Sequence, residues 1–297
     1  METKNIDLFG NVVITNPLLR DKFIEPPFSI LDTKSGNWQK RKKLWKRIGM
    51  KSEVGRDATT FNMKDWADKK REQGLKGHKL PSDTSIFDPA LCEVLYHWFV
   101  PKGGTILDPF AGGSVRGIVS NYLGYNYTGI DIRKEQVDSN YQQADEILTN
   151  ESHSAPIWIV GDADKSLDLL PKDQKFDFVF SCPPYADLEV YSDLEGDISN
   201  MNYDDFMIAY SSIIKKSISL LKEGGYACFV VGEVRDKKGN YIGFVPDTIK
   251  AFQNAGVGYY NEAILLNSIA SASMRANGNM KSKKLVKIHQ NVLIFKK

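Results

Sequence analysis

Two short segments carry residues suited to chemistry, each directly after a predicted buried strand. The first, Asp108–Gly113, reads DPFAGG and follows the apolar run Thr105–Leu107. The second, Ser181–Tyr185, reads SCPPY and follows the apolar run Phe176–Phe180. Small residues leave room for a ligand beside the backbone, and prolines offer a backbone that only accepts hydrogen bonds. We therefore expect a ligand site built from both segments.

The first segment forms part of a predicted strand–loop–helix unit. Pro109 ends the strand, because proline cannot donate to a strand ladder, and Val115–Leu123 has apolar residues at helical spacing. A second strand, Tyr125–Ile132, ends at Asp131, which follows Asp108 by 23 residues. That distance is close to the roughly 20-residue spacing of an acid that binds a ribose. The unit predicts a nucleotide-type cofactor site at the carboxyl edge of a sheet.

The remaining chain continues to alternate between strands and helices. Further strands are expected at 156–160, 176–180, 226–231, 260–266 and 291–295, and further helices at 90–99, 133–148, 204–221 and 245–254. This order predicts an α/β fold with a doubly wound, mostly parallel, seven-stranded sheet and an antiparallel element at its end. Asp162 follows the third strand and Glu233 follows the fifth, so both are expected at the carboxyl edge.

Composition limits the class of protein. The chain has 297 residues, a formal net charge of +2 and three cysteines far apart, which predict neither a disulfide framework nor a metal site. No apolar run approaches the ~20 residues that span a bilayer, and Met1–Gly10 lacks a signal-peptide pattern. A cytoplasmic protein is therefore expected. We predict an extension at 1–82 and a main domain at 83–297.

The extension is basic and aromatic, without clear alternation of strands and helices. Between Lys34 and Lys51 there are eight basic residues and no acid, with Trp38 and Trp45 interleaved. One basic helix is expected at 37–48, with tryptophans that pack on the main domain and cations that contact a phosphate backbone. A second basic stretch is expected in a long polar loop at 267–290. The candidate nucleic-acid contacts are Lys40, Arg41, Lys43, Arg275, Lys283 and Lys284.

The combination of DPFAGG and PPY at these strand ends resembles the S-adenosylmethionine-dependent DNA methyltransferases that modify base amino groups. The resemblance covers about residues 83–297, and the whole chain is similar to methylase proteins of phages and prophages. It implies that the Asp108 loop holds the methionine part of the cofactor, Asp131 the ribose hydroxyls and Asp162 the adenine amino group. The cofactor residues expected are Asp108, Pro109, Phe110, Ala111, Gly112, Gly113, Asp131, Ile132, Asp162, Ala163 and Phe87.

The chemistry of such an enzyme explains the residue types in the second segment. The sulfonium of S-adenosylmethionine makes its methyl group electrophilic without a metal, whereas the target amine is a poor nucleophile that acceptors must assist. Pro183 and Pro184 fix a backbone whose carbonyl can accept from the amine. The target base must leave the duplex, and Tyr185 supplies an aromatic face for it. The segment 187–204 is expected to be a lid over that base.

Cys182 departs from the family pattern, which has Asp, Asn or Ser before the two prolines. Its thiol is a weak acceptor, and Ser181 precedes it on the opposite side of an extended strand. Three alternatives follow: amino methylation of cytosine N4 or adenine N6 assisted by the backbone carbonyl, cytosine-C5 methylation with Cys182 as nucleophile and Glu233 as acid, or DNA binding without catalysis. We favour the first. An RNA methyltransferase is a further alternative, because the same chemistry serves both polymers.

Overall fold

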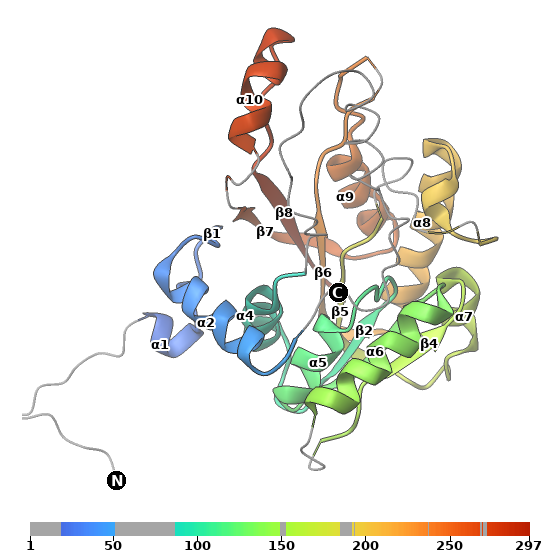
Figure 1. Cartoon of the computed structure of the whole chain (residues 1–297). Coiled ribbons are helices and arrows are strands. Elements are labelled where there is room, and N and C mark those ends of the chain that lie inside the picture. Colours follow the sequence, from blue (N-terminus) through green and yellow to red (C-terminus); the bar gives the residue numbers. More distant parts are fainter. Residues whose placement is uncertain are drawn as a thin grey trace, which may run out of the picture.

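The computed structural model describes residues 19–50, 87–148, 153–184, 192, 194–236, 238–267, 269 and 272–297. The described part forms one sheet covered by helices on both faces (Figure 1). The strands are β1 (Ile30–Asp32), β2 (Thr105–Asp108), β3 (Asn126–Asp131), β4 (Ile157–Val160), β5 (Phe176–Ser181), β6 (Leu221–Val231), β7 (Gly258–Leu266) and β8 (His289–Lys296). The helices are α1 (Leu19–Phe23), α2 (Gly36–Arg47), α4 (Pro89–Phe99), α5 (Val115–Tyr122), α6 (Lys134–Ile147), α7 (Ala163–Leu169), the 3₁₀ turn η2 (Ile198–Asn200), α8 (Tyr203–Ser219), α9 (Phe244–Asn254) and α10 (Ala272–Lys281).

The strand order places the two chemically interesting segments together. The order is β1-β7-β8-β6-β5-β2-β3-β4, and β8 alone runs antiparallel to its neighbours among these strands. From β2 the chain continues outward to β3 and β4, and then returns to the other side of β2 as β5. Such a switch in direction opens a crevice at the carboxyl ends of the two central strands. The predicted doubly wound, mostly parallel sheet is confirmed.

The sheet has one strand more than the seven predicted. β1, from the region expected to lack regular structure, adds to the sheet edge parallel to β7, with Ile30 opposite Ile264. Three residues are too few to show the alternating pattern by which a strand is recognised. The segment 267–290, expected to be a loop, contains α10. α7 begins at Ala163, directly after its N-cap Asp162, where no helix was predicted.

Side chains of the central strands alternate between two cores, one on each face of the sheet. On β5, Phe178 and Phe180 pack with α2, α4 and α5, whereas Val179 packs with α8 and α9. These packed faces hold the ends of β2 and β5 in fixed positions. Among the described residues, no helix is both long and apolar enough to cross a membrane.

The described part of the extension packs against the main domain through α2. Trp38 and Trp45 are buried, and their indole N–H groups donate to Asp88 at 3.1 Å and to Glu93 at 3.0 Å. Asp88 also caps α4, as its position before Pro89 predicts. The predicted helix and the packing of its tryptophans are confirmed. The predicted boundary at 82 lies outside the described residues, so the division into extension and domain stays a prediction.

Candidate cofactor and catalytic site

The turns that follow β2 and β5 are in direct contact. The two strands are parallel neighbours, with Ile106 opposite Phe178. The Ser181 hydroxyl donates to Asp108 Oδ1 at 2.5 Å and accepts from the Phe110 N–H at 3.2 Å. The sheet therefore brings the glycine loop and the proline turn to one edge, as the sequence predicts.

The Asp108 side chain is buried behind the glycine loop and does not line the ligand space. Its carboxylate is fully buried and accepts four hydrogen bonds, from Ser181, the Phe110 N–H, Arg116 Nε and the Tyr127 hydroxyl. Because both oxygens already have protein partners, the carboxylate fixes the loop instead of facing a ligand. This differs from the expectation that Asp108 itself holds the methionine part, since burial at the strand end was not visible in the motif.

The glycine loop leaves open space. Gly112 has φ of +51°, and a Cβ built on Gly112 or Gly113 would meet nothing within 4 Å. The loop is anchored from behind, because the Ala111 N–H donates to the Ile130 carbonyl at 2.8 Å and the Gly112 N–H donates to Asp131 at 2.9 Å. The room above the two glycines fits a bound cofactor.

Asp131 retains acceptor capacity at the end of β3. One of its oxygens accepts from the Gly112 N–H and the other from the Arg133 N–H at 2.8 Å. Each oxygen can accept a second hydrogen bond, which suits a pair of ribose hydroxyls. Burial raises the pKa of Asp131, and the N–H donors and the Arg133 charge oppose that rise in part. The neighbouring Ile132 is half-buried beside it.

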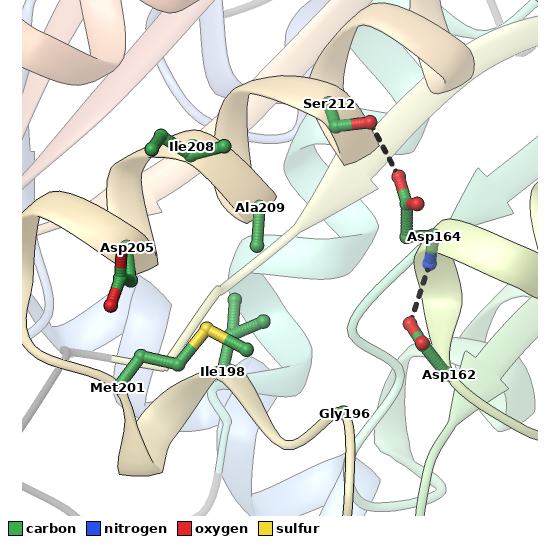
Figure 2. Close-up of a pocket in the computed structure, with 9 residues that line it drawn as sticks. All are labelled: Asp162, Asp164, Gly196, Ile198, Met201, Asp205, Ile208, Ala209 and Ser212. Atoms are coloured by element: carbon green, nitrogen blue, oxygen red, sulfur yellow. Dashed lines mark hydrogen bonds between the residues drawn. The ribbon is translucent and has the colours of Figure 1, made fainter.

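Asp162 is the N-cap of α7 and borders a cavity of about 410 Å³ (Figure 2). Its Oδ1 accepts from the Asp164 N–H at 2.9 Å, and its Oδ2 is 3.6 Å from Lys165 Nζ. A Cβ on Gly196 would lie 3.0 Å from Asp162 Oδ2, so the described part of the predicted lid packs beside this acid. Ala163 is buried in the first turn of α7. The residues lining the cavity are Asp162, Asp164, Gly196, Ile198, Met201, Asp205, Ile208, Ala209 and Ser212.

The proline turn itself is partly accessible. Cys182 and Pro184 are half-buried and Pro183 is buried, whereas Tyr185 lies outside the described residues. Phe87 approaches from the segment before α4, with its ring 5.6 Å from that of Phe180. The structure thus gathers the predicted Phe87, Ser181 and Cys182 near the glycine loop.

Glu233 lies at the carboxyl end of β6, but its side chain already has a hydrogen-bond partner in α9. Its Oε1 accepts from the Val245 N–H at 2.9 Å, and so it caps α9, whose N-cap residue Gly243 has no side chain to do so. Its Oε2 is buried without a hydrogen-bond partner among the described residues. Burial lowers the pKa of Lys287, and the charge of Glu233 opposes that shift.

Arg116 is the site residue that sequence reasoning missed. It lies in the first turn of α5 with its side chain 5% exposed, and it bonds Asp108 and the loop carbonyls. The available signal was a single cation within the apolar run Val115–Val119, eight residues after Asp108. A lone Arg on a helix is usually exposed, so the motif alone does not single it out.

The predicted basic contacts fall into two groups. Lys40, Lys43, Arg275 and Lys283 are exposed. Arg41 instead forms an ion pair with Glu93. The Lys284 side chain packs against Gly239, because a Cβ built on Gly239 would lie 2.1 Å from Lys284 Nζ.

Comparison with known proteins gives one family match. Residues 21–142, less than half of the chain, match a family model described as DNA methylase, of the N6/N4 type. This stretch includes the glycine loop and Asp131, and it ends before β4. No curated protein matches the chain.

Several solved structures are similar to this chain at low identity. TrmN from Thermus thermophilus is 12% identical with a TM-score of 0.47, and the match covers 72% of this chain and 50% of TrmN. A methyltransferase from Methanosarcina mazei that depends on S-adenosylmethionine is 17% identical with a TM-score of 0.46, over 68% and 96% of the two chains. Magnesium protoporphyrin IX methyltransferase from Synechocystis PCC 6803 is 15% identical with a TM-score of 0.46, over 84% and 98%.

These structural similarities are too distant to assign a substrate. The family match includes the first of the two motifs, and it confirms the resemblance over residues 21–142. Over residues 21–142 the chain resembles the DNA methylase family, and the activity and methyl donor that this resemblance suggests are proposed below.

Proposed function

We propose that the protein methylates an exocyclic amino group of a base in DNA, cytosine N4 or adenine N6, after the base has left the duplex. The observation that carries this proposal is the contact between the two turns: the Ser181 hydroxyl bonds both Asp108 and the Phe110 N–H. A methyl donor above the glycines and an amine at the prolines would then meet in one crevice. Reacting atoms must come within about 3–3.5 Å for transfer.

The cofactor supplies an electrophilic methyl group when bound, and the chain's residues hold and orient it. Asp131 has lone pairs left for ribose hydroxyls, and Gly112 and Gly113 leave space for the methionine part. Asp162 accepts from the adenine amino group through the oxygen that does not cap α7. Pro109, Phe110 and Ala111 shape the loop backbone, and Ile132, Ala163 and Phe87 supply apolar contact.

The proline turn acts on the amine. Pro183 and Pro184 have no N–H, so their segment presents only carbonyl oxygens, which accept from the amine as positive charge develops on it. Tyr185 stacks on the flipped base. Cys182 has a thiol that accepts weakly, so the backbone carbonyl has the larger share.

DNA approaches the carboxyl edge of the sheet, where basic side chains lie. β7 runs in the same direction as β6, because both are antiparallel to β8, so α10 leaves the sheet at the edge that holds the glycine loop. Arg275 and Lys283 in and after α10, together with Lys40 and Lys43 of α2, contact phosphates.

Transfer of a labelled methyl group from S-adenosylmethionine tests this function. DNA and RNA are offered in parallel, and the product is digested and its nucleosides are identified by mass spectrometry. N4-methylcytosine or N6-methyladenine in DNA is expected. A Cys182→Ser variant should keep its activity, because serine accepts better than a thiol. Carbon-5 methylation with complete loss in Cys182→Ser, or methylation of RNA alone, would contradict the proposal.

A further inference from the structure

We propose that Arg116 is a positioning residue that fixes the cofactor loop and links it to the catalytic turn; this inference rests on the proposed function. Arg116 Nε donates to Asp108 Oδ2 at 2.5 Å. Its Nη2 donates to the carbonyls of Phe110 at 2.6 Å and Ala111 at 2.9 Å. One guanidinium therefore holds the strand end and two consecutive loop residues.

The burial of this cation indicates a purpose other than stability. The Arg116 side chain is 5% exposed and that of Asp108 is 0% exposed. Burial alone would lower the pKa of Arg116, but the adjacent Asp108 carboxylate raises it, so the guanidinium stays charged. Replacing a buried ion pair by apolar residues of similar size is often neutral or stabilising. An apolar side chain in place of Arg116 would therefore be enough to pack beside Val115, Ile118 and Val119.

The bonds to the loop carbonyls set the shape of the space above the glycines. They draw the Phe110 and Ala111 carbonyls toward α5, which leaves the Gly112 side of the loop open. A planar guanidinium can reach a carboxylate and two carbonyls at once. A lysine ammonium could keep the ion pair, but as a compact group on a flexible stem it would not hold all three acceptors in place.

The same cation also reaches the catalytic turn through Asp108. Asp108 Oδ2 accepts from Arg116, and Oδ1 accepts from Ser181, the residue before Cys182. The guanidinium additionally lies 4.6 Å from the centroid of the Phe87 ring. A shift of Arg116 would therefore move the glycine loop and the end of β5 together. It would change the distance between the methyl donor and the target amine.

The test compares Arg116→Lys with Tyr127→Phe. The Tyr127 hydroxyl donates to the same Asp108 oxygen at 2.7 Å, but no hydrogen bond of its side chain to the loop carbonyls is observed. Tyr127→Phe therefore removes one buried donor to Asp108 but leaves the bonds of Arg116 to Asp108 and to the loop carbonyls in place. For each variant we would measure urea unfolding, the Kd for S-adenosylmethionine by calorimetry, and KM and kcat of DNA methylation.

We expect Arg116→Lys to raise the Kd and KM for S-adenosylmethionine about tenfold, because it loses charge-assisted bonds to the loop. Its kcat should fall as well, because the turn moves with the loop. Tyr127→Phe should destabilise the fold to a similar degree while changing the Kd less than about twofold. Equal changes in Kd for the two variants at equal loss of stability would overturn the inference.

A second pair of variants tests the link to the catalytic turn. If Arg116 acts through Asp108 and Ser181, the kcat losses of Arg116→Lys and Ser181→Ala should not add in the double variant. Additive losses would overturn the link. A wild-type protein that binds S-adenosylmethionine without methylating DNA would reject the proposed function but leave the Kd comparison decisive. A wild-type protein that does not bind it would reject both.

Discussion

The two basic helices, α2 and α10, differ in charge and in their relation to the rest of the protein. α2 carries six basic residues and α10 carries two, and neither helix contains an acid. α2 is fastened by buried Trp38 and Trp45, and two of its cations pair with acids of the α4 segment: Arg41 with Glu93 and Lys42 with Asp88. α10 has one buried residue, Ala272, and stands out from the sheet (Figure 1). Its Met274 and Met280 are exposed.

This difference shows that a count of basic residues does not measure the charge available to a polyanion. Two of the six cations on α2 are paired with acids of the α4 segment. After Glu262 the sequence contains no acidic residue, so nothing in the last part of the chain compensates α10. We therefore expect α2 to stabilise the fold through its tryptophans and two ion pairs, and α10 to contribute to DNA binding without contributing to stability.

The largest effect is expected from Trp38→Ala in α2. The change removes an indole that is 1% exposed and its hydrogen bond to Asp88. Loss of a buried Trp typically lowers the free energy of unfolding by ~3–5 kcal/mol. Urea unfolding measures it, with Leu44→Ala as control on the same helix, where an exposed side chain should change stability by less than ~0.5 kcal/mol. If both changes lowered the free energy of unfolding by the same small amount, α2 would not be needed for the stability of the fold.

A smaller effect is expected when charge is removed from α10. Arg275→Gln with Lys281→Gln should weaken DNA binding about tenfold at moderate salt. The slope of log Kd against log salt should fall by about two, one for each phosphate contact. The unfolding free energy should not change, because both side chains are exposed. Binding is measured by fluorescence anisotropy at several salt concentrations.

The matched control removes the same charge from the opposite edge of the sheet. Lys102 and Lys172 are exposed and precede β2 and β5, so they lie away from the glycine loop. Lys102→Gln with Lys172→Gln should leave affinity and salt slope nearly as in the wild type. If both double variants lose affinity equally, only net charge matters and α10 is not a specific contact.

The contrast between the helices also shows what the sequence could and could not predict. The glycine loop and the proline turn were placed correctly at one edge, because apolar runs and strand-ending prolines are local signals. Trp38 and Trp45 indicated packing for the same reason. The pairing of Arg41 with Glu93 was not predicted, because it joins residues 52 positions apart. Arg116 was missed because its burial depends on Asp108, Tyr127 and Phe87 meeting in space.

The smallest effect separates two kinds of cation within α2 itself. Arg41→Gln removes the ion pair with Glu93, which then keeps the Trp45 indole N–H as a donor. The free energy of unfolding should fall by about 1 kcal/mol, the typical net value of such a bond, while DNA affinity stays unchanged. Lys40→Gln with Lys43→Gln should do the reverse, because both lysines are exposed: a modest loss of affinity without loss of stability. Urea unfolding and DNA titration on the same samples measure both quantities. A loss of DNA affinity in Arg41→Gln at unchanged stability would mean that Arg41 leaves Glu93 to bind a phosphate. The distinction between the anchored helix α2 and the exposed helix α10 would then no longer hold.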